Sequence, residues 1–332
     1  QGYSSAASDV YKRQLYEYYQ RCQEYLLEPV VLNMSDTLFR MAGERQDERM
    51  QAVAIATQLD YYYFQGTNED SVIHYTNKVK EFAKATHQPK YYYFAWANRL
   101  ITYYLKTSRT NIALYEVQNM LKEAQEEDDK TGLSRCYNIM SQIYTIKRFD
   151  SMAFEWRLKE IELTEKYKIE NYNISQTYAQ IANYYINQKK QKEALAAVEK
   201  AIATANSSTQ QISAKLEFVN YYSKFGDFQA AEKLLKECQA AFEQDKRLES
   251  IKKRLYNIEC LYYQQTKQYQ KALEAAKMQE KEERRLSESI LSSIHYRTQG
   301  EIYQKMGNMN LAVKYLQMYI NADDSLKIAN EQ

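Results

Sequence analysis

Apolar residues recur along the chain at helical spacing and fall into pairs of segments. Within residues 175–188, for example, Tyr178, Ile181 and Tyr185 form one stripe on a helix, and residues 191–205 carry a second stripe. The pairs that stand out are 175–188 with 191–205, 214–225 with 228–242, and 296–306 with 309–320. Two residues separate the members of each pair, so the pattern predicts antiparallel helix pairs joined by short turns.

A tyrosine precedes a small residue by nine positions in most of these pairs. The six cases are Tyr104 and Ala113, Tyr144 and Ala153, Tyr185 and Ala194, Tyr222 and Ala231, Tyr263 and Ala272, and Tyr303 and Ala312. The alanines recur at intervals of 40, 41, 37, 41 and 40 residues, and Tyr63 with Val72 adds a degenerate copy. A period this regular predicts stacked units, none of which buries its apolar face alone. The alanine allows the two helices to approach, and we expect the tyrosine to fill the space over it.

Composition agrees with an all-α fold. The 332 residues include only 7 glycines and 2 prolines, and most of the 33 tyrosines follow the repeat, which is typical of core packing. Two of the glycines mark expected turns, at Gly226-Asp227 and Gly307-Asn308. With 45 basic and 43 acidic residues, the charge balance gives no reason to expect a nucleic acid or an anionic membrane as partner. No apolar run reaches the roughly 18 residues that span a bilayer.

Two stretches resemble tetratricopeptide (TPR) repeats. They are Tyr296-x-x-Gln299-Gly300-x-x-Tyr303 with Gly307-Asn308-x-x-x-Ala312, and Tyr222-x-x-x-Gly226-Asp227-Phe228-x-x-Ala231. The chain departs from the TPR pattern in losing most Leu-Gly pairs and in having a period near 40 instead of 34. The resemblance covers residues 46–322 and implies an α-solenoid of about seven to eight helix pairs. Residues 15–45 are expected to form a divergent N-terminal capping pair, with Pro29 at a helix start.

The last residues carry a second, less specific resemblance. Residues 311–332 are similar to the final TPR of bacterial sensor histidine kinases and membrane-linked regulators, in which this helix leads into a coiled coil, a membrane span and an output domain. The resemblance implies that residues 323–332 are a truncated continuation of the last helix. It also implies that a homodimer would form through a missing C-terminal coiled coil, with no direct membrane contact from this fragment.

The N-terminal residues need a separate interpretation. Residues 4–14 match, position by position, one translated frame of a transposon adapter used in preparing sequencing libraries. We therefore interpret residues 1–14 as an adapter-derived scar, disordered and packed on nothing; the alternative is a genuine Ser/Ala-rich tail. This interpretation implies that the true N-terminus is missing. The sequence therefore does not decide between cytoplasm and periplasm as the compartment.

Catalytic motifs are absent from the sequence. His74, His87 and His295 fall in three different repeats without the spacing of a metal site, and neither a phosphate loop nor a nucleophile elbow is present. We therefore expect neither enzymatic activity nor a cofactor. Residues 280–285 mix charges at helical spacing and are expected to form a solvated face. Cys238 and Cys260 are expected on neighbouring helices, either as two small buried side chains or as a disulfide.

One pattern of polar residues is not explained by core packing or by a charged surface. Asn98, Asn138 and Asn257 lie six residues before the repeat tyrosine, while Asn183 and Asn220 lie two before it. These positions are four apart and share one face of the first helix, pointing away from the tyrosine. In a TPR solenoid this face lines the concave groove, and an amide offers donors and an acceptor for a peptide backbone. Gln142, Lys224, Gln264 and Arg297 fall on or near the same side, and the alternative is that all are ordinary solvent-facing residues.

Two classes of function follow. The chain is expected to be a scaffold that binds a protein or an extended peptide in its groove, as the sensory or interaction arm of a bacterial signal-transduction protein truncated at both ends. The alternative is a free-standing TPR adaptor or assembly factor without an output domain.

Overall fold

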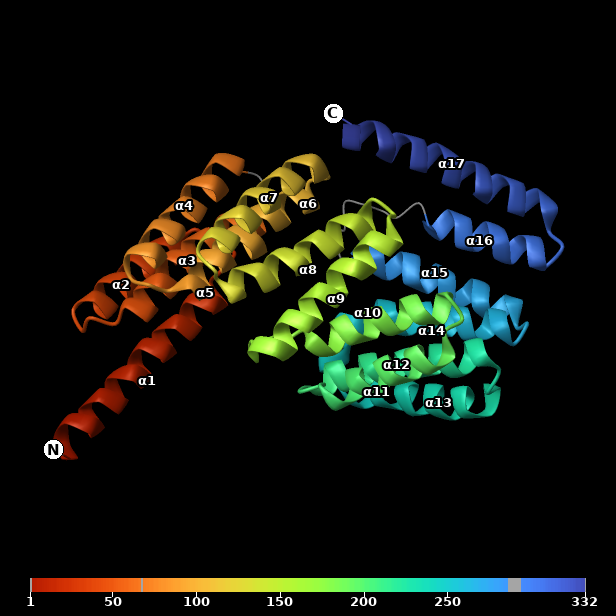
Figure 1. Ribbon diagram of the computed structural model, residues 1–332, viewed down its shortest axis with the longest axis horizontal. Helices are drawn as coiled ribbons and strands as arrows, with labels where there is room; N and C mark the ends of the chain where they lie inside the picture. Colours follow the sequence, from red (N-terminus) through yellow and green to blue (C-terminus); the bar gives the residue numbers. More distant parts are fainter. Residues whose placement is uncertain (1, 67, 286–293, 332) are drawn as a thin grey trace. The chain divides into compact units, whose positions relative to one another are not determined.

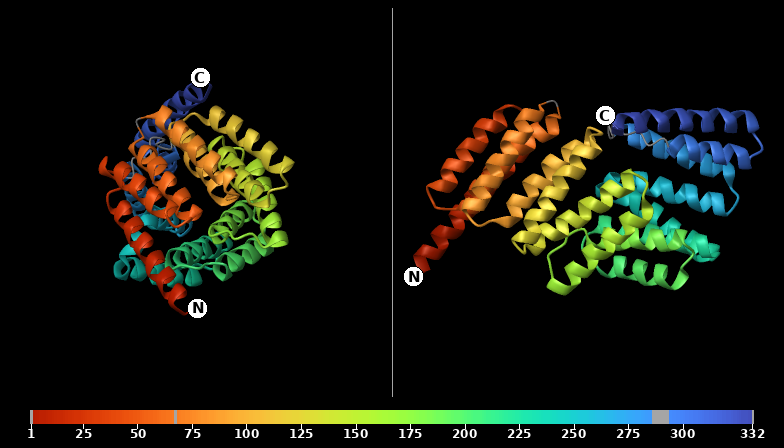
Figure 2. Two further views of the ribbon diagram at one scale, coloured as in Figure 1. Left: turned by 90° about the vertical axis from the view of Figure 1, so that its left-hand side faces the viewer. Right: turned by 45° about the horizontal axis from the view of Figure 1, so that its top comes forward.

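The computed structural model describes residues 2–66, 68–285 and 294–331, and the side chains of 10–66, 68–283 and 294–323. The chain divides into two compact units, Gln1–Ile143 and Tyr144–Gln332. Figures 1 and 2 show that both are built from stacked helices.

Unit 1 contains α1 (Gly2–Glu24), α2 (Val30–Gly43), α3 (Glu48–Gln65), α4 (Glu69–Ala85), α5 (Pro89–Tyr93), the π-helix η1 (Phe94–Ile101), α6 (Thr102–Lys106), α7 (Thr110–Glu126) and most of α8 (Lys130–Ile146). Unit 2 contains the end of α8, α9 (Asp150–Tyr167), α10 (Ile174–Asn187), α11 (Gln191–Ala203), α12 (Ser208–Phe225), α13 (Phe228–Gln244), the 3-10 helix η2 (Lys246–Ile251), α14 (Lys252–Gln265), α15 (Tyr269–Arg285), α16 (Ile294–Lys305) and α17 (Met309–Glu331).

The prediction of an all-α solenoid is confirmed. When α5, η1 and α6 are counted as one continuous helix, the seventeen α-helices of the described residues become sixteen long ones, and no strand occurs among those residues. Consecutive helices pack as pairs, such as α10 with α11, α12 with α13 and α14 with α15. None of the helices described is long and apolar enough to cross a membrane.

The nine-residue spacing has a direct structural cause at the turn between paired helices. The carbonyl of Tyr222 accepts a hydrogen bond from the backbone N–H of Asp227 (2.9 Å), and the carbonyl of Asp227 accepts one from Ala231 (3.0 Å). The first bond spans five residues and closes helix α12, while the second spans four and opens α13. The same two bonds recur at the other five tyrosine–alanine pairs. Together the two bonds span nine residues, which fixes the spacing between the tyrosine and the alanine.

The residue four positions after each repeat tyrosine has a left-handed backbone. Gly226 (φ +89°) and Gly307 (φ +77°) confirm the two predicted turns. The other four turns place Ser108, Arg148, Lys189 and Lys267 at φ between 56° and 61°. These residues lack the freedom of glycine, so their conformation is imposed by the hydrogen bonds of the turn and by the packing of the helices on either side.

Every small residue of the repeat is buried, which confirms the predicted register. Ala113, Ala153, Ala194, Ala231 and Ala272 have no exposed surface, and Val72 and Ala312 are buried as well. The tyrosines before them are buried in three repeats and half-buried in the others. The four cysteines are also buried and free. Cys238 and Cys260 belong to different apolar clusters, and burial raises the pKa of each thiol to about 11.

Two expectations differ from the structure. Residues of the proposed scar belong to α1, and Tyr11 donates a hydrogen bond to the Met41 carbonyl (3.0 Å) and packs on the first apolar cluster. Residues 2–14 are therefore helical and Tyr11 has contacts, while the origin of residues 1–14 stays a prediction. Within the mixed-charge run at 280–285, whose side chains are described up to 283, the expectation of a solvated face is wrong for two residues. Glu282 and Glu283 are buried, and Glu283 pairs with His295 and Lys253 because α14 and α16 pack beside α15.

Candidate functional site

The first helices of three consecutive pairs lie side by side in unit 2. Helix α10 contacts α12, and α12 contacts α14. Hydrogen bonds join them on the side away from their partner helices: Asn183 Nδ2 donates to Glu217 Oε1 (3.2 Å), and Arg254 Nη2 donates to Glu217 Oε2 (2.8 Å). We call the surface formed by these three helices the inner groove.

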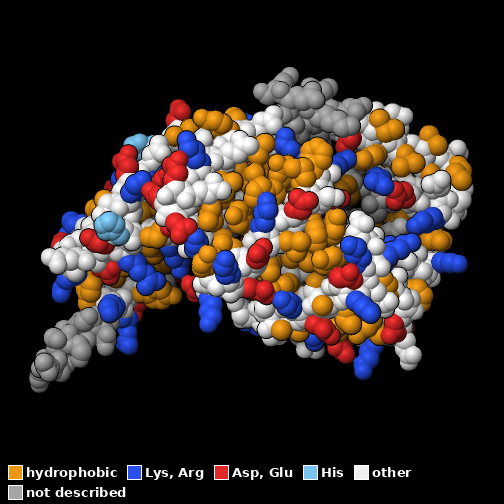
Figure 3. All heavy atoms as spheres, in the orientation of Figure 1, with side chains coloured by type: hydrophobic (Ala, Val, Ile, Leu, Met, Phe, Trp, Pro, Cys, Tyr) orange, Lys and Arg blue, Asp and Glu red, His pale blue; other side chains and the backbone are white. Residues whose placement is uncertain are grey.

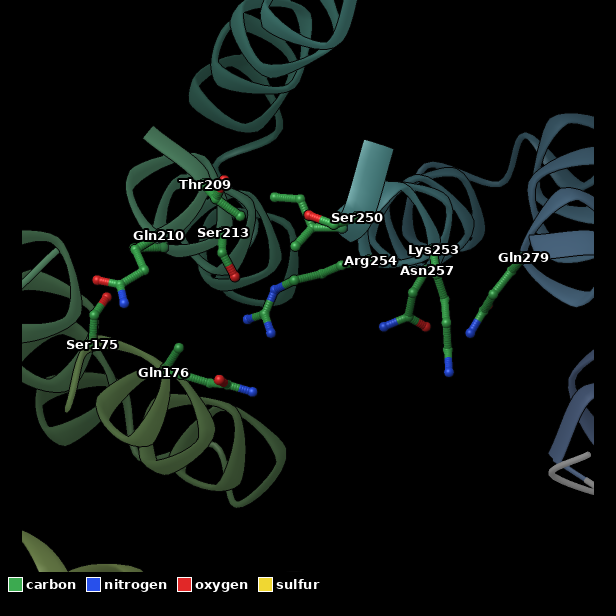
Figure 4. A pocket seen from close by; sticks show the side chains of 13 residues that line it. Ser175, Gln176, Thr209, Gln210, Ser213, Ser250, Lys253, Arg254, Asn257 and Gln279 are labelled. Atoms are coloured by element: carbon green, nitrogen blue, oxygen red, sulfur yellow. The ribbon is translucent and has the colours of Figure 1, made fainter. Parts of the chain in front are cut away.

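Three adjoining hollows follow the inner groove. The first, of about 430 Å³, lies between Gln176 of α10, Ser213 of α12 and Arg254 of α14. In Figure 4 the Arg254 side chain reaches from α14 toward Ser213 and Gln176, with Asn257 and Lys253 beside it. The second and third hollows have volumes of about 330 and 230 Å³. Asn257 lines all three, so the hollows adjoin one another along the groove.

Glu217 is the centre of the groove's polar network. Its side chain is buried, and besides Asn183 and Arg254 it accepts a hydrogen bond from Asn220 Nδ2 (2.8 Å). A buried carboxylate is costly unless it is paired and hydrogen-bonded, and here one guanidinium and two amides meet that need. The network therefore holds α10, α12 and α14 in register.

Arg157 of α9 lies at the side of the second hollow and is only 9% exposed. Its Nε donates to Gln180 Oε1 (2.9 Å), and its Nη2 donates to Thr145 Oγ1 (2.7 Å). Burial lowers the pKa of Arg157, against the opposing effect of Glu160 and Asp150. The guanidinium is thus fixed in place by two neutral acceptors.

The predicted site residues divide into two groups. Asn183, Asn220, Lys224 and Asn257 come together around the third hollow. Asn220 is 7% exposed, so the expectation of an exposed side chain is wrong there, because its amide is held by Glu217. Asn257 is half-buried and forms no hydrogen bond with any other described residue. It leaves its amide available to a ligand.

The other predicted residues have partners elsewhere. In unit 1, Asn98 Oδ1 accepts from Arg135 (2.6 Å), and Asn138 Oδ1 accepts from Gln142 (2.7 Å). In unit 2, Gln264 Oε1 accepts from Lys305 (3.2 Å), and Arg297 pairs with Glu301 (2.8 Å). None of these five candidates lines the three hollows.

Sequence reasoning missed Glu217, Arg254 and Arg157. The first two have a detectable signal, since each lies three residues before a groove asparagine on the same helix face. Arg157 has none, because it belongs to a second helix. Across the face seen in Figure 3, positive and negative side chains are interspersed. Among the described residues, no group of His, Cys, Asp and Glu is arranged to hold a metal ion.

Comparison with known proteins identifies the fold. No family model matches the sequence, and no curated protein matches it significantly. Among solved structures, a Rap protein complexed with competence and sporulation factor has a TM-score of 0.55 at 12% identity, covering 97% of this chain and 99% of the other. The Rap conjugation regulator of plasmid pLS20, in complex with the Phr* peptide, has a TM-score of 0.59 at 9% identity, covering 96% and 97%.

The apo form of the quorum sensor NprR from B. thuringiensis is also similar, with a TM-score of 0.55 at 14% identity and coverage of 94% and 99%. At these identities the similarity concerns the fold. The class is that of helical repeat proteins, and the fold is a TPR-like α-solenoid, as the sequence resemblance implied.

Proposed function

We propose that this chain is a non-enzymatic scaffold that binds an extended peptide or protein segment along the inner groove. The observation that carries the proposal is the amide of Asn257, which no other described residue uses and which lines all three hollows of the groove. Amides both donate and accept, which suits the alternating N–H and C=O groups of an extended backbone.

The spacing of the helices supports an extended ligand. Packed helices lie about 8–10 Å apart, and an extended chain rises about 3.3 Å per residue. Successive first helices would therefore meet every third residue of the ligand. Three helices span two such intervals, so we expect the groove to hold a segment of about six residues.

Similar structures support the same kind of ligand. The Rap regulator of pLS20 was solved in complex with the Phr* peptide, and the other Rap protein with competence and sporulation factor. For the present chain this is an argument from fold, and the groove residues described above carry the proposal themselves.

In its finer form, the proposal makes this chain the interaction arm of a bacterial sensor kinase or regulator. The support is the sequence resemblance of residues 311–332. The alternative is a free-standing adaptor. Sequencing the coding region on both sides distinguishes them, because a coiled coil and a membrane span after Gln332 would favour the signalling arm and an early stop codon the adaptor.

The binding proposal is tested by selecting ligands from a displayed library of random ten-residue peptides against the full chain. We expect binders whose affinity falls in the double variant Asn183→Ala with Asn257→Ala. Asn310→Ala is the matched control, since Asn310 is exposed on α17. Recovery of no binders, or equal binding by all variants, would contradict the proposal.

A further inference from the structure

Arg157 lines the second hollow of the inner groove and has hydrogen-bond donors that no described residue uses. A guanidinium has five N–H bonds. Gln180 and Thr145 engage two of them, and the remaining three, including both on Nη1, form no hydrogen bond with another described residue. A guanidinium edge with free N–H groups is the natural partner of a carboxylate, which binds it through two parallel hydrogen bonds.

The carboxylates near Arg157 do not use these donors. Glu160 is buried on the same helix and accepts from Asn171 Nδ2 (3.0 Å), while Asp150 is exposed at the rim of the hollow. Neither forms an ion pair with Arg157. The other carboxylate of the hollow, Glu217, is committed to Arg254. Arg157 is therefore a buried cation without a paired anion.

A buried charge without an ion pair weakens a fold, so its presence calls for an explanation. Neutral acceptors hold the Arg157 guanidinium, and the nearby carboxylates of Glu160 and Asp150 favour its charged form without forming an ion pair with it. That arrangement suits a binding group that is oriented in advance. From this geometry we propose that Arg157, in the second hollow, binds a carboxylate of the peptide that occupies the inner groove. This deepens the proposed function and rests on it.

The carboxylate has two possible sources in a peptide, an acidic side chain and the C-terminus. Three capped probes separate them: acetyl-Ala-Glu-Ala-amide, acetyl-Ala-Gln-Ala-amide and acetyl-Ala-Ala-Ala with a free C-terminus. The readout is the Nε–Hε resonance of Arg157 in the full chain labelled with ¹⁵N-arginine, assigned with Arg157→Gln.

We expect the Arg157 resonance to shift with the glutamate probe or the free-acid probe, and the probe that acts identifies the source. The glutamine probe should leave it in place. Arg40 serves as the internal control, because it is exposed on α2 and pairs with Glu44. Equal shifts with all three probes, or none, would overturn the carboxylate assignment.

A second experiment uses the peptides selected from the library. Changing the acidic group of a selected peptide to its amide should weaken binding about 10- to 100-fold, and Arg157→Gln should cause the same loss without adding to it. Binders that lack an acidic group, or that ignore Arg157→Gln, would refute the carboxylate site while the peptide-binding function stands. A library without binders contradicts the proposed function instead.

The folded state gives an independent check. Because Arg157 has no paired anion, Arg157→Met should leave the thermal midpoint unchanged or raise it. A marked fall would mean that the guanidinium has a structural partner and would count against the proposal.

Discussion

The asparagines of the first helices occupy the same sequence register in both units but have different surroundings. In unit 1, Asn98 and Asn138 are each engaged by a neighbouring side chain. In unit 2, Asn183 and Asn220 share one buried carboxylate, and Asn257 is left available in the groove. The register decides which face an amide occupies. The neighbouring side chains, on the same helix for Asn138 and Asn220 and one repeat away for Asn98 and Asn183, decide whether it is free to bind.

A second difference lies in the helix that carries Asn98. This helix contains the π-helical stretch Phe94–Ile101, whereas α10, α12 and α14 are regular. A π-helical turn takes one more residue than an α-helical turn, so side chains before it rotate relative to those after it. Asn98 therefore does not keep the angle to Tyr104 that an ideal α-helix predicts.

The largest effect should come from removing the carboxylate that organises unit 2. Glu217→Ala leaves the partly buried Arg254 and two amides without their partner. We expect a loss of about 2–3 kcal/mol, below the range for a fully buried pair because Arg254 is a quarter exposed. Native-state hydrogen exchange of α12 and α14 measures it.

The unit 1 counterpart sharpens this contrast. Asn98→Ala removes a hydrogen bond between an exposed amide and the Arg135 guanidinium, so we expect a loss of about 1.5 kcal/mol, the low end for a bond to a charged group. Similar losses at both sites would mean that Glu217 does not organise unit 2 in the way described.

Overpacking should affect both units alike, since the small residue of the repeat is fully buried in each. Ala113→Leu and Ala231→Leu should each cost about 1–3 kcal/mol, because the added carbon atoms have no space between the paired helices. Urea denaturation followed by circular dichroism provides the measurement. A neutral outcome in one unit alone would show that its helices separate more easily.

The turns offer a smaller effect of opposite sign in the two units. A side chain added at Gly226 meets no atom within 4 Å, so Gly226→Ala should cost about 1 kcal/mol through its left-handed backbone alone. Ser108 of unit 1 has the same backbone without being glycine, and Ser108→Gly should be neutral or stabilising by up to about 1 kcal/mol. The thermal midpoint of Gly226→Ala should fall, and that of Ser108→Gly should rise or stay unchanged.

These turns also show what the sequence can and cannot predict. Gly226 and Gly307 predict a turn from the sequence alone. The same conformation occurs without a local signal at Ser108, Arg148, Lys189 and Lys267. There the spacing between tyrosine and alanine is the signal, because it reflects two hydrogen bonds that every turn shares.

The sequence predicts which helix face forms the groove, but it does not predict the hydrogen-bond network on that face. Its asparagines follow the helical register, whereas Glu217 meets Asn183 and Arg254 across 34 and 37 residues, which is one repeat in each direction. Single-helix periodicity contains no information about such partners. The repeat period does: residues one period apart on first helices are neighbours, and a carboxylate one period from an arginine is a candidate pair.

The smallest change in stability should accompany a clear change in binding. Asn257→Ala removes an amide that no other described residue uses, so the free energy of unfolding should change by no more than about 0.5 kcal/mol. The same change should weaken a selected peptide by up to about tenfold, since one hydrogen bond contributes about 0.5–1.5 kcal/mol. Asn138→Ala is the matched variant in unit 1, where the amide is already paired with Gln142, and it should leave affinity unchanged. Titration calorimetry of both variants with one peptide decides the matter. If Asn138→Ala weakens binding as much as Asn257→Ala does, the ligand contacts both units, and pairing with a neighbour does not remove an asparagine from the binding surface.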